Sequence, residues 1–330
     1  MLSGVESAVS FGMESCVSRS GKGGSIGSGL GESGESNSRE LWAGHWGIAR
    51  EMGKGKGASM ATVSDVCRTL EELAPVGLAE SWDNVGLLLG HRNWEVSTLM
   101  TCLTLTERVA AEAVERGVQM VITHHPILFR SAKRLTDETA EGRIIMKLMT
   151  SGIAVYSAHT AFDSATAGIN QQLAEHFGLT EICALRGRQG DPSLGAGRMG
   201  RLQNPLGREE FLDRVATVTG ADWVQWVAAG PEVIQRVAVG CGAAGDFLAD
   251  AAVAGCDTFV TGEARFHTAI EAESRGMNLV LLGHYASERP AMVELAATLG
   301  VRLPDLRCVV SAQDRDPLQA RLYAGRMPGR

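Results

Sequence analysis

The stretch from Gly117 to Phe129, GVQMVITHHPILF, constrains the fold more than any other part of the chain. Its apolar, β-branched run VQMVIT predicts a buried strand, which is followed at once by two histidines and a proline. Open α/β sheets bind their ligands at the carboxyl ends of their strands. His124 and His125 therefore stand where chemistry is expected. Adjacent residues of an extended chain point to opposite sides, so the pair suits two neighbouring metal ions better than one. The alternative interpretation is a polar loop with two unpaired histidines.

Composition excludes several classes of protein. The 330 residues are 45% hydrophobic, which is enough for a globular core, and the formal charge is −7. This charge argues against nucleic acid as a partner and against a polybasic membrane surface. The seven cysteines contain no Cys-x-x-Cys pair, and no apolar run reaches the ~18–20 residues of a membrane helix. We therefore expect a cytoplasmic protein that is not inserted in a membrane.

Residues 1–59 differ from the rest of the chain. They are rich in Gly and Ser and show no hydrophobic periodicity, so they cannot bury enough apolar surface to offset the entropy of ordering. We expect either a disordered extension or a mis-assigned start, with translation beginning at Met60.

Two further apolar runs end in polar clusters. The predicted strand IAVYSA is followed by His159 and Asp163, and the predicted strand NLVLLG is followed by His284 and Glu288. In each pair the carboxylate comes four residues after the histidine, which places both on one side of a helical turn. Imidazole and carboxylate together suit zinc, iron, manganese or cobalt. Three such clusters at three strand ends predict a metal site at the edge of a sheet.

The segment Gly240–Gly245, GCGAAG, leaves two interpretations open. It matches the G-x-G-x-x-G pattern of dinucleotide-binding proteins, follows a predicted strand, and has Glu263 about where a ribose-binding acid would stand. However, Asp246 at the start of the next predicted helix would repel a pyrophosphate, and the glycines alone would permit a tight turn. Glu263 and His267 would share one face if that segment is helical.

Other expectations concern the elements around these clusters. Helical spacing predicts a helix over residues 62–74 with Ser64 as its N-cap, and a strand–helix–strand unit over 97–123 with a parallel crossover. Asp83 and Asn84 are expected to bond backbone amides in a buried turn. Residues 186–207, rich in Gly, Arg and Pro, predict a loop and a domain boundary.

Five motifs together resemble the Nif-three-like family, also called GTP cyclohydrolase I type 2 homologues: SWDNVGLLLG, VITHHPILF, SAHTAFD, TGEARFH and GHYASE, within residues 60–315. The resemblance implies an α/β fold of two α/β domains with the metal site at their interface. The expected division is residues 60–185 plus 282–330 as the metal-binding domain and 186–281 as the second domain. It also implies a homohexamer made of two trimers.

The implied site holds two divalent transition-metal ions. The resemblance assigns as ligands His124, His125, Asp163, His284 and Glu288, with Glu288 as the bridge and His159 as a close neighbour. Family members often have Asp where this chain has Thr104.

The expected activity is metal-assisted hydrolysis of a small molecule, with His159 or Glu263 moving protons. The substrate would be opened in a GTP cyclohydrolase-like reaction or would be another nucleotide or phosphoester. A non-enzymatic metal-binding scaffold or chaperone that acts through partners is the main alternative. A nicotinamide-dependent enzyme built on the glycine loop is a third hypothesis.

Overall fold

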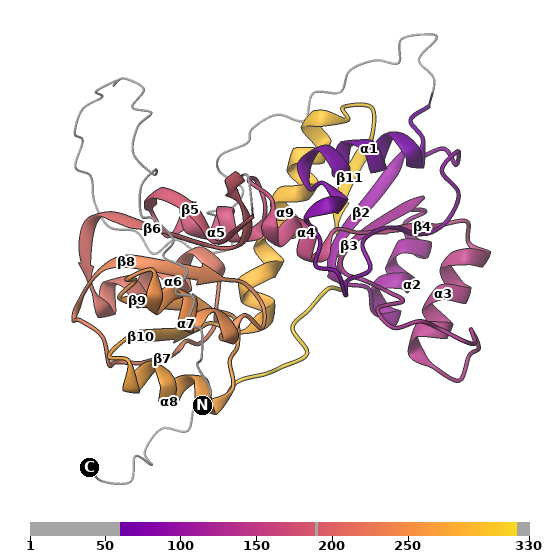
Figure 1. Cartoon of the computed structure of the whole chain (residues 1–330). Coiled ribbons are helices and arrows are strands. Elements are labelled where there is room, and N and C mark those ends of the chain that lie inside the picture. The colour runs from indigo at the N-terminus through magenta and orange to yellow at the C-terminus, as the bar shows by residue number, and fades with distance from the viewer. Residues whose placement is uncertain (1–59, 189–190, 322–330) are drawn as a thin grey trace, which may run out of the picture. The chain divides into compact units, whose positions relative to one another are not determined.

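The computed structural model describes residues 60–188 and 191–321 (Figure 1). The expectation for residues 1–59 therefore lies outside the described residues. Two β-sheets and nine α-helices make up the described chain. The expected mixed α/β fold is confirmed. Within these ranges none of the helices combines the length and apolar character that a bilayer crossing requires.

The first sheet has the strand order β1-β4-β3-β2-β11. Its strands are β1 (Gly86–Leu89), β2 (Thr98–Thr104), β3 (Met120–His125), β4 (Ala154–Ser157) and β11 (Arg307–Val310). All neighbours are parallel except β1, which runs antiparallel to β4. Helix α2 (Glu107–Glu115) connects β2 to the parallel strand β3, as predicted.

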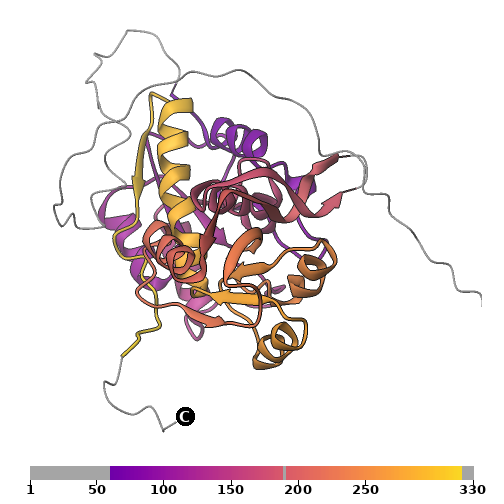
Figure 2. The same cartoon turned by 90° about the vertical axis from the view of Figure 1, so that its left-hand side faces the viewer.

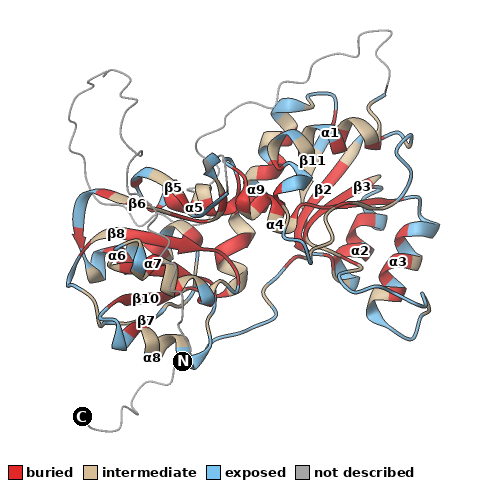
Figure 3. Cartoon of the chain, viewed as in Figure 1, coloured by how far each residue is buried: buried red, intermediate tan, exposed pale blue. Residues whose placement is uncertain are grey.

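Helices cover both faces of this sheet because its strands present apolar side chains on both sides. Helix α5 (Ile169–His176) contacts strands of the second sheet, and on one face of the first sheet pack α1 (Val63–Leu73), α4 (His159–Ser164) and α9 (His284–Arg302). On the other pack α2 and α3 (Ala140–Thr150). Figure 2 shows α9 running beside β11, and Figure 3 shows that β2, β3 and β4 are mostly buried.

The second sheet has the order β5-β6-β8-β9-β10-β7. Its strands are β5 (Leu179–Arg188), β6 (Asp191–Gly207), β7 (Gln225–Val227), β8 (Val233–Gly240), β9 (Thr258–Thr261) and β10 (Asn278–Leu281). Only β8, β9 and β10 are parallel to one another. Its helices are α6 (Arg208–Thr219), α7 (Leu248–Val253) and α8 (Phe266–Ser274), and two short 3₁₀ turns, Val76–Leu78 and Gly245–Phe247, complete the described elements.

The prediction of a loop over residues 186–207 was wrong. This segment forms most of the long antiparallel hairpin of β5 and β6. Strand pairing overrode composition here, because glycine lets the two backbones approach closely: a Cβ on Gly200 would lie 2.8 Å from the Thr180 carbonyl oxygen. β5 begins before the expected domain boundary, while the division into two domains itself stays a prediction.

The N-cap of α1 was also misassigned. Thr62, and not Ser64, accepts a hydrogen bond from the Asp65 amide, and the Asp65 carboxylate accepts one from the Thr62 amide in return. This reciprocal capping box satisfies two backbone donors that the helix cannot satisfy itself.

Candidate metal centre

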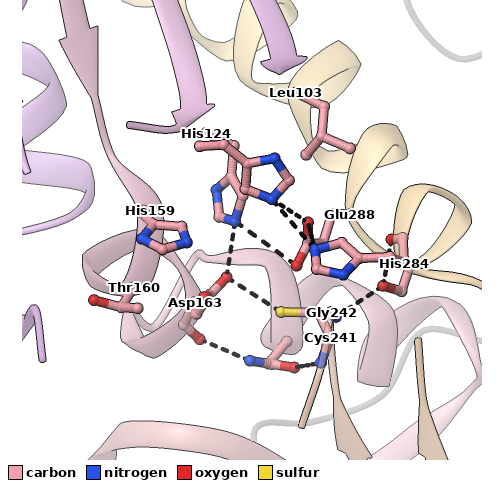
Figure 4. Close-up of polar contacts among 12 residues, drawn as sticks. Leu103, His124, His159, Thr160, Asp163, Cys241, Gly242, His284 and Glu288 are labelled. Atoms are coloured by element: carbon pink, nitrogen blue, oxygen red, sulfur yellow. Dashed lines mark hydrogen bonds and ion pairs between the residues drawn. The ribbon is translucent and has the colours of Figure 1, made fainter. Parts of the chain in front are cut away.

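Five parallel strands from the two sheets end in the residues of one polar cluster. β3 ends in His125, β4 is followed by His159, β8 by Cys241, β9 by Glu263 and β10 by His284. Figure 4 shows His159, Cys241 and His284 converging around Glu288. These polar side chains therefore lie at the carboxyl ends of strands in both sheets, and not at the edge of a single sheet.

Glu288 lies at the centre of the cluster with only 5% of its side chain exposed. Its Oε2 atom is 3.0 Å from Nε2 of His125 and 3.1 Å from Nε2 of His284. Those two nitrogens are 3.3 Å apart. His284 and Glu288 occupy the first turns of α9, so their predicted helical spacing is confirmed.

His124 is fully buried, yet neither of its ring nitrogens has a hydrogen-bond partner within the described chain. Its Nε2 atom lies 3.6 Å from Oδ1 of Asp163 and 3.9 Å from Oε1 of Glu288, beyond ordinary hydrogen-bond distance. A buried polar group without a partner costs roughly 1–3 kcal/mol. Such an orphaned nitrogen, facing two carboxylates, fits a metal ligand.

Asp163 is held from both ends. The Cys241 thiol donates to its Oδ1 at 3.2 Å, and the Asn170 side chain donates to its backbone carbonyl at 3.1 Å. Asn170 also accepts the Cys241 backbone N–H at 2.8 Å, so one amide side chain ties α4 to the end of β8. Sequence reasoning did not single out Cys241 or Asn170. The position of Cys241 directly after a buried strand, like that of the histidines, was the available signal.

Three histidines have a second partner that fixes the ring. Nδ1 of His125 is 2.7 Å from the Thr104 hydroxyl, and Nδ1 of His284 is 2.9 Å from Glu263. Nδ1 of His159 is 2.7 Å from the buried carboxylate of Asp83. Partners of this kind are typical of metal-binding histidines, because they set the tautomer and the ring orientation.

Asp83 does bond backbone amides, as predicted, since it accepts from the N–H groups of Asn84 and Thr160. Its bond to His159 was not foreseen. Burial would raise the pKa of Asp83, but the bonds from His159 and Thr160 outweigh it and lower the pKa to about 2. Burial would lower the pKa of His159, and the bond to Asp83 reverses this and raises it.

The pKa values of the central groups diverge in the metal-free protein. Burial lowers the pKa of His124 to about 3, so its imidazole is neutral and able to bind a cation. The bond to Glu288 raises the pKa of His284 to about 9. Burial and the charge of Glu288 raise the pKa of Asp163, whereas the surrounding histidines, His124 first, lower that of Glu288 against the effect of burial. The pKa values of Asp163 and Glu288 thus diverge, as in sites where two carboxyl groups share one negative charge.

Two overlapping groups of potential ligands share His125. His124, His125 and His159 form one, and His125, His284 and Glu288 form the other, with the donor atoms of each within 4.8 Å of one another. His159 therefore offers a donor atom beside those of the predicted ligands His124 and His125.

Side chains of this cluster occupy the space beside the glycine loop Gly240–Gly245. The Gly242 N–H donates to Ser287 Oγ at 2.9 Å, and a Cβ at this position would lie 2.2 Å from Oε1 of Glu288. A Cβ on Gly240 or Gly245 would likewise meet an alanine Cβ, at 2.7 and 2.9 Å. The glycines therefore serve close packing of the protein against itself, which disfavours a bound pyrophosphate.

The helix that would place Glu263 and His267 on one face does not include Glu263. Glu263 precedes α8, which begins at Phe266, and His267 is exposed outside the cluster. Instead, Glu263 contacts His284, and its side chain is 54% exposed.

Comparisons with known proteins agree with the motifs. The family model described as Duf34/NIF3 (NGG1p interacting factor 3) matches residues 61–317. A Clostridium perfringens protein named GTP cyclohydrolase 1 type 2 homolog is 32% identical over 258 residues, 78% of this chain and 98% of that protein. The Schizosaccharomyces pombe protein NIF3 homolog is also 32% identical, over 77% of this chain and 96% of its own length.

Solved structures show the same fold. Staphylococcus aureus hypothetical protein SA1388 superposes with a TM-score of 0.72 at 27% identity, covering 80% of this chain and all of that one. Reduced HcgD from Methanocaldococcus jannaschii does so with a TM-score of 0.66 at 26% identity, over 76% and 99%. The family model and the curated relatives cover the part of the chain that carries all five motifs, and the chain belongs to the Duf34/NIF3 family.

Proposed function

We propose that this chain is a hydrolase that binds two divalent transition-metal ions, of zinc, iron, manganese or cobalt. The observation that carries the proposal is His124, a buried neutral imidazole with two orphaned nitrogens, of which Nε2 faces Asp163 and Glu288. The ligands would be His124, His125, Asp163, His284 and Glu288; Glu288 belongs to one of the two groups that share His125, and its Oε1 faces His124 of the other. When bound, such ions acidify water and polarise a phosphoryl group or ring carbon.

The remaining residues would position ligands and move protons. Asp83 occupies Nδ1 of His159, which leaves Nε2 as the nitrogen able to exchange a proton with a substrate. Glu263 bonds Nδ1 of His284, so we assign it first to orienting that ring, and its exposure also allows it to exchange protons with solvent. Thr104 takes the same orienting role for His125.

The names of the relatives support a substrate class. Proteins similar to this chain are named GTP cyclohydrolase 1 type 2 homolog, and the proposed reaction is hydrolysis of a nucleotide or another phosphoester, including ring opening of the GTP cyclohydrolase kind. We further propose a cytoplasmic hexamer of two trimers, which sizing by light scattering would test.

Elemental analysis of gently purified protein, combined with a screen of nucleotides and phosphoesters, tests this proposal. We expect about two ions per chain in wild type, and loss of both metal and turnover in His125→Ala and Glu288→Ala. His267→Ala, which removes an exposed histidine outside the cluster, is the matched control and should keep both. Turnover that survives in a metal-free variant would refute the hydrolase mechanism.

A non-enzymatic role is the second candidate. It is favoured by the family description itself, which names an NGG1p interacting factor. This candidate predicts wild-type protein with bound metal and no turnover of any compound in the screen.

A further inference from the structure

Two large aromatic side chains stand exposed beside the candidate metal centre. Trp82 is 59% exposed and Phe129 is 48% exposed. Their rings contact each other edge to face, with centroids 5.9 Å apart. Exposed aromatic pairs of this kind leave apolar surface in water, which favours a role in binding.

Both rings adjoin His159. The centroids of Trp82 and Phe129 each lie 6.1 Å from that of His159, which in turn lies 5.2 Å from His124 and 5.7 Å from His125. One imidazole therefore separates the aromatic pair from the predicted ligands. A molecule held by the aromatic pair would have its neighbouring atoms within reach of the cluster.

The backbone that presents Phe129 is held in a strained conformation. Leu128 has φ 63°, a left-handed value that a leucine adopts only at a cost. Its N–H donates to Glu141 Oε1 at 2.8 Å, and its carbonyl accepts from Asn84 Nδ2, also at 2.8 Å. Such strain persists where surrounding bonds enforce it, and it concentrates at ligand clamps.

The segment that carries Trp82 is fixed by the same region. Asp83 bonds His159, and Asn84 bonds the Leu128 carbonyl, so the two residues after Trp82 tie it to both the metal centre and the Phe129 turn. The two rings are thus exposed but anchored, which lowers the entropy lost when a ligand binds.

We propose that Trp82 and Phe129 bind the planar heteroaromatic ring of the substrate, a purine base in a nucleotide, while its polar part reaches the histidine–carboxylate cluster. This inference rests on the proposed function for the location of the reaction, narrows its substrate to a purine nucleotide and adds the residues that bind the base. Bases stack on aromatic faces regardless of hydrogen-bond pattern, and alanine substitution of such a platform weakens binding roughly 5- to 150-fold.

The test compares two probes, GTP and inorganic tripolyphosphate, titrated into the protein with the metal it carries after purification. Wild type should bind GTP more tightly than tripolyphosphate. Trp82→Ala and Phe129→Ala should each weaken GTP binding roughly 5- to 150-fold and leave tripolyphosphate binding unchanged, and Trp82→Phe should recover most of the loss. Matched controls are Trp226→Ala and Phe266→Ala, which remove exposed aromatic residues elsewhere and should have no effect.

Two results would overturn the inference: equal binding of both probes by wild type, or equal GTP binding by wild type and Trp82→Ala. The measurement is of binding alone, so it separates this inference from the hydrolase proposal. If Trp82→Ala loses GTP affinity while wild type turns over no compound in the screen of nucleotides and phosphoesters, the aromatic site is supported and the hydrolase proposal is refuted. If wild type turns over a compound of the screen and Trp82→Ala keeps its GTP affinity, the hydrolase proposal is supported and the aromatic site is refuted.

Discussion

Replacing Gly242 by alanine should disable the proposed metal centre without substituting any of its proposed ligands. Gly242 has φ +60°, and a Cβ added there would lie 2.2 Å from Oε1 of Glu288 and 3.3 Å from Nε2 of His284. The Glu288 carboxylate would have to retreat by roughly 1 Å to reach ordinary van der Waals contact. Backbone on the other side of the glycine cannot yield easily, because its N–H is bonded to Ser287.

Gly242→Ala should have two effects, one on folding stability and one on metal affinity. Alanine in the left-handed region costs about 1 kcal/mol of folding stability relative to glycine. The displaced carboxylate matters more for binding, since metal–oxygen bonds of about 2.0–2.2 Å do not tolerate a shift of this size. Changes to partners of metal ligands alone already cost roughly 10–100-fold in affinity, so we expect metal affinity to fall by about 100-fold or more.

Gly220→Ala provides the matched control. Gly220 caps α6 with φ +66°, and a Cβ there would meet nothing within 4 Å, so this variant carries the backbone strain without the clash. Gly220→Ala should lose about 1 kcal/mol, or about 2–4 °C in the Tm of the chelator-treated protein, and Gly242→Ala should lose at least as much. Only Gly242→Ala should lose metal in a competition titration with a chromogenic chelator. Wild-type metal affinity in Gly242→Ala would refute the packing argument.

Three further predictions concern other parts of the structure. Arg198 is fully buried and donates to the Ser164 and Ala165 carbonyls at the C-terminal end of α4. Arg198→Met should therefore lower the free energy of unfolding in urea by about 2–4 kcal/mol and weaken metal binding through Asp163. Arg198→Lys should recover part of both losses. Burial would raise the pKa of Glu112, but its bond from Ser311 and further bonds from backbone amides and an arginine lower it. Wild type should therefore be more stable than Glu112→Gln by about 1–2 kcal/mol at pH values above the ordinary carboxyl pKa of about 4.3. This difference should disappear as the pH falls through the lowered pKa of Glu112. A difference that grows in acid would contradict the prediction. Chelation should lower the Tm of wild type, and metal at about 100 times its Kd should restore about 2.7 kcal/mol; equal Tm values with and without metal would exclude a specific site.

Local sequence determined the elements that carry the site. The apolar runs before His124, His159 and His284 predicted buried strands with chemistry at their ends, and the spacing of four placed His284 and Glu288 on one helical turn. These features depend on side chains only a few residues apart, so periodicity and turn chemistry suffice to predict them. The family motifs added the ligand set as an expectation.

Tertiary structure decided which of these ends meet and what fills the space between them. His125 and Glu288 are separated by 163 residues and Cys241 and Asp163 by 78, and no local pattern encodes such pairs. The β5–β6 hairpin formed against its composition, because cross-strand bonds and close glycine contacts outweigh intrinsic propensity. Likewise, GCGAAG matches a dinucleotide-binding pattern, but Glu288 occupies the space that Gly242 leaves open. A glycine pattern specifies only that backbone must come close to something, and the fold decides what that is.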